Sequence, residues 1–220
     1  MKRIAVLTAL LFAALQIGYA QKVGLVLSGG GAKGAAHIGV IKALEENGIP
    51  IDYITGTSAG AIVGSLYAMG YTPEEMVELM LSEEFSYWQT GTVENEYKYY
   101  FKRPDPTPEF GHFSIDMTDS LQVKASFFPQ SLINPIQMNQ AFMALFSQAT
   151  AKAGWNFDNL FVPFRCVASD IYSKKAIIFK NGDLGDAVRA SMTFPFFFQP
   201  IWKDSVPIFD GGIYDNFPVG

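Results

Sequence analysis

Two glycine-rich turns, at residues 29–34 and 56–60, constrain the fold of this 220-residue chain more than any other feature. Each turn follows a short apolar run that is typical of a buried strand, residues 23–27 and 51–55, and each precedes a segment with helical spacing. Strand, tight turn and helix, repeated in this order, predict an α/β domain with right-handed crossovers. We therefore expect a three-layer α/β/α sandwich around a mainly parallel sheet.

Composition excludes several classes of protein. Hydrophobic residues make up 49% of the chain and charged residues 17%, so a globally disordered state is excluded. The net charge is −5, which argues against a nucleic-acid partner that binds through a basic face. The single cysteine, Cys166, excludes an intramolecular disulfide and a cysteine-clustered metal site. No metal or other cofactor is expected.

The N-terminus has the pattern of a secretory signal peptide. Lys2 and Arg3 precede an uncharged, mostly apolar run over residues 4–15, and small residues at Gly18 and Ala20 precede Gln21. The apolar run is short for a transmembrane helix, which needs about 20 residues. We expect residues 1–20 to direct export to the periplasm, the outer membrane or the medium.

Further helices and strands are predicted around and beyond the two glycine turns. The spacing predicts helices over about 33–47, 59–69, 73–81, 134–149 and 184–192, a hairpin of strands 162–168 and 175–180, and a last strand ending at 208–210. Between them, residues 83–133 show little periodicity, and a quarter of residues 85–128 are aromatic. This segment is predicted to be an insertion or lid whose aromatic side chains fill a small core of their own.

The second glycine turn matches the pattern G-x-S-x-G. A sharp strand-to-helix turn of this kind exposes the serine hydroxyl in strained geometry, so Ser58 is a candidate nucleophile. The helix dipole at this position favours developing negative charge. The alternative is that Ser58 only caps the following helix.

The first glycine turn allows two functions. Gly29, Gly31 and Gly34 match the G-x-G-x-x-G pattern of dinucleotide-binding proteins. Asp52, however, opens the second strand, whereas a ribose-binding acid belongs at the far end of that strand. The other function is an oxyanion hole made by the amides of Gly29, Gly30 and Gly31. Neighbouring parallel strands would bring both turns to the same end of the sheet.

A serine nucleophile needs a base, and the chain offers three candidates. His37 lies inside the first predicted helix, where packing is the more common role, and His112 lies in the aromatic insertion. Asp210 ends the last predicted strand and is followed by Gly211 and Gly212, which permit close approach to a neighbouring turn. Asp210 is therefore the favoured base, although an Asp-Gly pair also suits a simple turn.

In this order, Gly-Gly-Gly-Ala-Lys-Gly, Gly-Thr-Ser-Ala-Gly and Asp-Gly-Gly resemble the motifs of the patatin-like phospholipases, exported bacterial members included. The resemblance covers about residues 22–220 and implies a lipid acyl hydrolase with a Ser-Asp dyad that works through an acyl-enzyme, without metal or cofactor. The roles it implies are these: nucleophile Ser58, base Asp210, oxyanion hole Gly29, Gly30 and Gly31, nucleophile elbow Gly56, Thr57, Ala59 and Gly60, and base turn Gly211 and Gly212.

The resemblance also implies a partner, a phospholipid or another acyl ester, and a membrane surface as its source. Domains of this family usually continue beyond the Asp-Gly-Gly turn, so residues 21–220 are expected to be the N-terminal catalytic part of such a domain. Two other functions stay open at this stage: an NAD(P)-dependent oxidoreductase that uses residues 29–34, and a lipid-binding module without catalysis.

Overall fold

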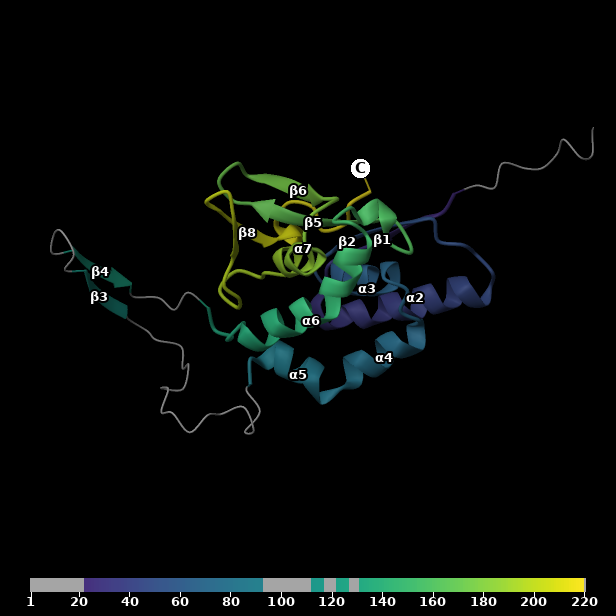
Figure 1. Cartoon of the computed structure of the whole chain (residues 1–220), viewed down its shortest axis with the longest axis horizontal. Coiled ribbons are helices and arrows are strands. Elements are labelled where there is room, and N and C mark those ends of the chain that lie inside the picture. Colours follow the sequence, from purple (N-terminus) through teal and green to yellow (C-terminus); the bar gives the residue numbers. More distant parts are fainter. Residues whose placement is uncertain (1–21, 93–111, 117–121, 127–130, 220) are drawn as a thin grey trace, which may run out of the picture.

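The computed structural model describes residues 22–92, 112–116, 122–126 and 131–219 (Figure 1). The predicted signal peptide, residues 1–20, and most of the predicted insertion lie outside the described residues.

A six-stranded mixed sheet organises the domain. Its path runs β1-β2-β5-β8-β7, and β6 pairs with β5 off this path. The strands are β1 (Gly24–Leu27), β2 (Tyr53–Thr57), β5 (Phe164–Asp170), β6 (Lys175–Phe179), β7 (Ile201–Lys203) and β8 (Val206–Asp210). The pairs β1–β2 and β2–β5 are parallel, as predicted for the strands that carry the glycine turns. The predicted hairpin is confirmed as the antiparallel pair β5–β6.

Two strands share one edge of β5. Thr57 at the end of β2 pairs with Val167, and Asp210 at the end of β8 pairs with the next residue of β5, Ala168. Strand β6 pairs with residues 166–170 of β5, which include residues that pair with β2 and residues that pair with β8. Strands β2 and β8 must therefore both lie on the edge of β5 opposite β6. Their C-terminal ends therefore meet.

Six α-helices and one four-residue 3₁₀ turn accompany the strands in the described part of the chain. They are the 3₁₀ turn η1 (Gly31–Gly34) and helices α2 (Ala35–Glu46), α3 (Ala59–Ala68), α4 (Pro73–Leu81), α5 (Glu83–Thr90), α6 (Ile136–Lys152) and α7 (Leu184–Ser191). Two short 3₁₀ turns, η3 (Phe157–Asn159) and η4 (Gly211–Ile213), and a separate hairpin of β3 (His112–Asp116) and β4 (Gln122–Ser126) complete the described elements. Among these residues, no helix is long and apolar enough to cross a membrane.

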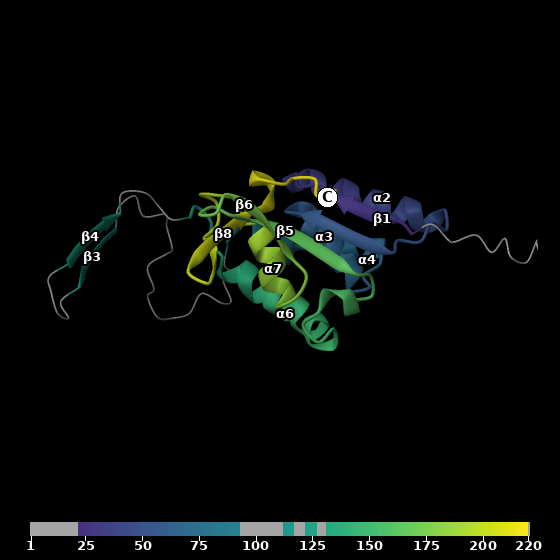
Figure 2. The same cartoon turned by 90° about the horizontal axis from the view of Figure 1, so that it is seen from above.

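The two helices that pack most directly on the sheet lie on one of its faces. Helix α3 contacts β1, β2 and β5, α7 contacts β5 and β8, and the two helices contact each other (Figure 1). Figure 2 shows the molecule from above, with the strands over the helices. The α/β class is confirmed, but the second helical layer of the predicted sandwich is not among the described residues. Successive right-handed crossovers in one direction, β1 to β2 to β5, place their helices on the same face.

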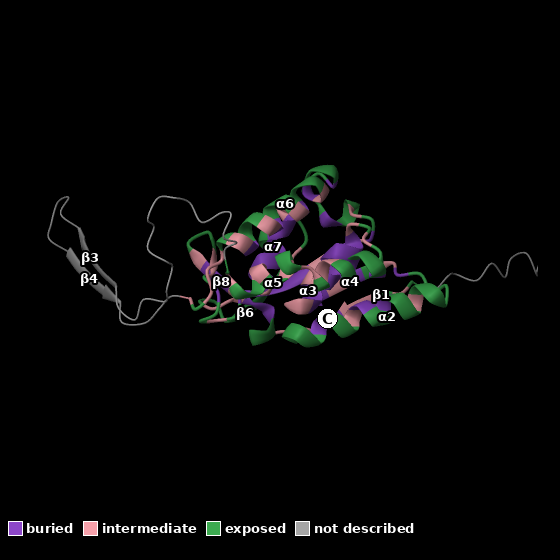
Figure 3. Cartoon of the chain, turned by 90° about the horizontal axis from the view of Figure 1, so that it is seen from below, coloured by how far each residue is buried: buried purple, intermediate pink, exposed green. Residues whose placement is uncertain are grey.

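The core lies between this face and its helices. Eight of the ten residues of α3 are buried, which explains why that segment is apolar all round (Figure 3). Leu27, Ile54 and Phe164 extend the core from three neighbouring strands. Gly64 of α3 faces the side chains of Ile54 and Phe164, so the helix approaches the sheet closely.

Helix α5 occupies the start of the segment that was predicted to be an irregular insertion. Ser82 caps it by accepting a hydrogen bond from Phe85 N–H, and Gly91 ends it in the left-handed conformation. The ring of Trp88 meets that of Phe142 on α6 edge to face at 6.1 Å. Residues 83–90 are therefore part of the helical layer.

Candidate active site

Ser58 stands at the sharp turn between β2 and α3. Its φ of 54° and ψ of −119° are rare for a residue with a side chain, and its hydroxyl makes no capping hydrogen bond to α3. The turn is tight because Gly60 lies against the backbone of Leu27, where a Cβ atom would overlap the carbonyl group. These features match a nucleophile elbow and argue against a capping role for Ser58.

The carboxylate of Asp210 lies close enough to the Ser58 hydroxyl for that hydroxyl to lower the pKa of the carboxylate. Asp210 is only 6% exposed, and its Oδ1 also accepts the Gly212 N–H at 2.7 Å. Burial raises the pKa of Asp210 above its usual value, although the nearby Ser58 hydroxyl and the Gly212 N–H act in the opposite direction. A raised pKa makes this carboxylate a stronger base.

The sheet explains why these two residues meet. Ser58 follows the last residue of β2, and Asp210 is the last residue of β8. Since the ends of β2 and β8 adjoin on one edge of β5, the side chains converge from opposite directions. Gly211 lies where a Cβ atom would overlap the Val167 carbonyl, which keeps the base turn close to β5.

The first glycine turn lies beside the elbow. Gly34 packs against Ala59, and Gly29, Gly30 and Gly31 line the same cavity as Ser58. The Gly29 N–H donates to the carbonyl of Asn216 at 3.2 Å. Within the described part of the chain, no hydrogen bond from the N–H of Gly30 or Gly31 is found. These two amides are therefore the available donors of the three that the sequence singled out.

Two residues at the end of α7 hold the pair in place, and the motif spacing did not single them out. The buried Ser191 hydroxyl accepts the Ser58 N–H at 3.0 Å and donates to the Val167 carbonyl. The Thr193 carbonyl accepts the Asp210 N–H at 2.8 Å. Motif spacing could not identify these roles, because they depend on contacts between segments that lie far apart in the sequence.

The other polar candidates lie apart from the pair. The ring of His37 hydrogen-bonds through Nε2 with the Ser28 carbonyl at 2.9 Å, which ties α2 to the end of β1. Asp52 accepts the Val23 N–H at 2.7 Å, at the opposite end of the strands from the glycine turns. The side chain of His112 lies outside the described part. In that part, no group of three or more metal-ligating side chains is found.

A large, mainly apolar cavity of about 1200 Å³ opens onto Ser58 and Asp210. Its apolar wall comes from α4, α5, α6 and the segment after α7, and consists of Met80, Leu81, Phe85, Trp88, Ile133, Met138, Phe142, Met192, Phe194, Phe197 and Phe198. Most of the polar groups lie at the Ser58 end, with the glycine turns, Asp210 and Asn216, and Gln89 of α5 adds one polar side chain to the apolar wall. The arrangement suits a ligand with one reactive polar end and a long apolar tail.

Comparison with known proteins agrees with this geometry. The sequence model of the patatin-like phospholipase family matches residues 25–220. Lysophospholipase NTE1 of Pyricularia oryzae is 31% identical over 201 residues, which are 90% of this chain and 11% of that protein. Human patatin-like phospholipase domain-containing protein 6 is 30% identical over 200 residues, 89% of this chain and 12% of that protein. The chain thus spans about an eighth or less of these relatives.

A solved structure shares the fold. The crystal structure of VipD from Legionella pneumophila aligns with a TM-score of 0.55 and 18% sequence identity, over 90% of this chain and 47% of that one. At this identity the likeness concerns the fold alone.

Proposed function

The chain belongs to the patatin-like phospholipase family, and on that premise we propose that it is a serine lipid acyl hydrolase with Ser58 as nucleophile and Asp210 as base. The observation that carries the proposal is a strained serine whose hydroxyl lies beside a buried carboxylate in a mainly apolar cavity. The ring of His37, the histidine whose side chain is described, instead bonds with the Ser28 carbonyl.

The proposed reaction has two halves. Asp210 takes the hydroxyl proton while Ser58 Oγ attacks the acyl carbonyl carbon, and the N–H groups of Gly30 and Gly31 bind the resulting oxyanion. Collapse of this intermediate breaks the ester bond, and the leaving alcohol takes the proton from Asp210. Water then attacks the acyl-enzyme with Asp210 again as base, releasing the fatty acid and restoring Ser58.

The cavity indicates the substrate class. Its apolar wall suits a fatty acyl chain, and the relatives compared above are named lysophospholipase and patatin-like phospholipase. We therefore propose a phospholipid or another lipid ester as the substrate. Export through residues 1–20 is a separate proposal that is based on the sequence pattern alone.

The two alternative functions find less support. NAD(P) binding would need an acid at the C-terminal end of β2, but Asp52 precedes β2 and accepts the Val23 N–H at the other end of the strands. A lipid-binding module without catalysis would not require the strained backbone of Ser58 or its buried carboxylate partner.

Labelling with a fluorophosphonate probe tests the proposal. We expect the wild-type protein to be labelled covalently and Ser58→Ala to remain unlabelled. Ser65→Ala is the matched control, because Ser65 is buried in α3 and donates only to the Ile62 carbonyl, so this variant should be labelled like the wild type. An unlabelled wild type, or equal labelling of Ser58→Ala, would refute the proposal.

A further inference from the structure

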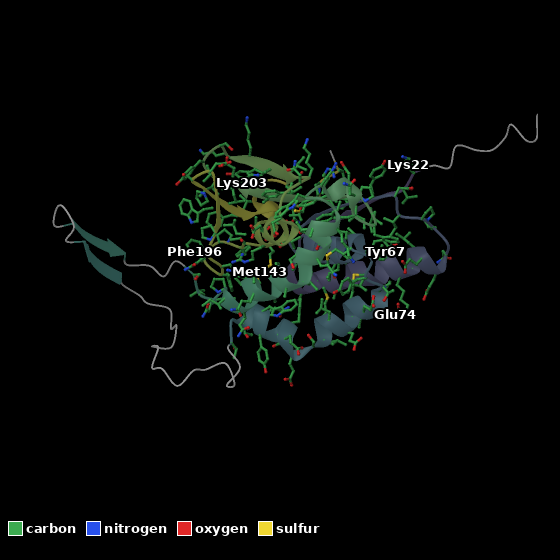
Figure 4. The ribbon with its side chains drawn as sticks, viewed as in Figure 1. Lys22, Tyr67, Glu74, Met143, Phe196 and Lys203 are labelled. Carbon is green, nitrogen blue, oxygen red and sulfur yellow. The ribbon has the colours of Figure 1, made fainter. Side chains whose placement is uncertain are left out.

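The loop after α7 exposes three phenylalanine rings, two of which line the cavity. Phe196 is 74% exposed, Phe194 57% and Phe197 45%, whereas Phe198 is buried beneath the guanidinium of Arg189. In Figure 4, Phe196 projects from the edge of the molecule. An aromatic ring loses favourable burial energy when it stays in water, so three such neighbours require an explanation.

The backbone holds these rings outward. Phe196 adopts a φ of 68°, which is costly for a bulky residue. The strain persists because the carbonyls of Phe196 and Phe197 accept hydrogen bonds from the N–H groups of Leu132 and Ile133, at 2.8 and 2.9 Å. The rings of Phe194 and Phe197 also meet edge to face at 5.7 Å. The exposure is therefore built into the fold.

The same hydrogen bonds bring further apolar side chains to this place. Leu132 and Ile136, just before and at the start of α6, are both about half exposed. Together with the three rings they form one surface, here called the apolar face: Leu132, Ile136, Phe194, Phe196 and Phe197.

The apolar face is uncharged as well as exposed. Residues 131–151 contain no Asp, Glu, Lys or Arg, and neither do residues 190–202, although the whole chain has a net charge of −5. A partner attracted by charge would find nothing to pair with here. Phe194 and Phe197 also line the cavity, so the face is continuous with the path to Ser58.

From this combination we propose that the apolar face docks on a lipid bilayer without net charge, with Phe196 inserted among the acyl chains. The proposal rests on the proposed function, since a lipid leaving the bilayer beside Phe194 and Phe197 would enter the cavity directly. Binding depends on apolar burial and therefore varies little with ionic strength.

Vesicle binding tests this surface without turnover. In the Ser58→Ala background, Phe196→Ser should bind phosphatidylcholine vesicles about tenfold more weakly in a sedimentation assay, since one inserted ring is lost. Phe161→Ser is the matched control. Phe161 is also 74% exposed, but its ring packs against Tyr67 near the C-terminal end of α3, whereas Ser58 precedes the N-terminal end. It should bind like its parent, and 0.5 M NaCl should change binding little.

Three results would overturn the proposal. Equal binding of Phe196→Ser and its parent would exclude insertion at this face, and loss of binding in high salt would indicate an electrostatic contact. A dimer that Phe196→Ser dissociates in sedimentation velocity, with vesicle binding unchanged, would make the face an interface between two copies. Hydrolysis of a water-soluble short-chain ester by the wild type tests the proposed function separately.

Discussion

At the level of single residues, the site depends on a carboxylate that is kept away from water. Burial raises the pKa of Asp210, and the nearby Ser58 hydroxyl only partly offsets the effect. The residue is thus poised to accept a proton, at a cost to the stability of the fold. Two predictions follow from this balance, one on activity and one on stability.

Replacing Asp210 with Asn should lower kcat for ester hydrolysis by about 10²- to 10⁴-fold, the usual contribution of a general base. The wild-type profile of kcat/KM against pH should have its acidic limb above the ordinary Asp range of about 4, because the folded-state pKa is raised. Full activity of Asp210→Asn, in a stopped assay over a range of pH, would assign the base elsewhere.

The same variant should be more stable than the wild type at pH 7. A carboxyl group whose folded-state pKa is raised stabilises the fold when protonated, and that contribution is lost as the pH rises through the folded-state pKa. Asp210→Asn cannot ionise, so its melting temperature should exceed that of the wild type at pH 7. The difference should shrink toward about pH 4. A constant difference across this range would contradict the pKa shift.

The principal pair could be predicted from sequence because glycines mark it. Gly56 and Gly60 flank Ser58, and Gly211 and Gly212 follow Asp210, so the tight turns are visible without a structure. Ser191 has no such mark. It bonds to Ser58 from 133 positions away, and only the folded chain brings the two together.

At the level of elements, the end of α7 acts on both members of the pair. Its Ser191 hydroxyl binds the Ser58 N–H, and the Thr193 carbonyl just beyond it binds the Asp210 N–H. The buried Arg189 side chain stabilises the segment after α7, because its guanidinium donates hydrogen bonds to Thr193 Oγ1 and the Gln199 carbonyl. Ser191 is therefore a positioning residue for the proposed reaction.

Ser191→Ala should lower kcat about tenfold with little change in KM, because the elbow loses the acceptor that fixes the Ser58 backbone. The unpaired buried N–H should also cost about 1–3 kcal/mol of unfolding free energy. Ser65→Ala removes another buried serine whose bond stays within α3, and should leave kcat unchanged. If both variants reduced kcat equally, the effect would be one of general stability.

Helix α5 forms part of the cavity wall through Phe85 and Trp88. Trp88→Ala should lower kcat/KM for a long-chain ester such as the palmitate about tenfold relative to the butyrate, because only the long chain reaches this wall. Trp155→Ala is the control: Trp155 is exposed and does not line the cavity. An unchanged ratio in Trp88→Ala would show that the chain takes another path.

Periodicity predicted the elements that bury a clear face or carry strong end signals. Helix α4, for example, begins at Pro73 after Thr72, two residues typical of a helix start, and the structure shows the Thr72–Glu75 capping box. Helix α5 escaped prediction because it is short and has no fully buried residue. Its position depends on aromatic contacts with α6, a partner that lies far along the chain.

At the level of the whole molecule, stability should be concentrated around α3. This helix is buried on nearly all sides and packs against three strands, while α5 contains no fully buried residue. In native-state hydrogen exchange, amides of α3, β2 and β5 should exchange slowest, through global unfolding, and those of α5 should exchange through local opening. Equal protection of α3 and α5 would show a single cooperative unit.

The sheet's outline could be predicted, but its full topology could not. Alternating strands and helices indicated the parallel pairs β1–β2 and β2–β5, which depend on local patterns and chirality. The place of β8 on the same edge of β5 as β2 depends on pairing between distant segments. No spacing in the sequence encodes that choice.

Strand pairing with two adjacent residues of β5, Val167 and Ala168, fixes the positions of the nucleophile and the base. The distance between Ser58 and Asp210 is then independent of how many residues connect β2 to β8. Insertions or deletions in the connecting segments could accumulate through evolution without moving either residue. A slip of one residue in the pairing of β8 would instead turn Asp210 to the other face of the sheet.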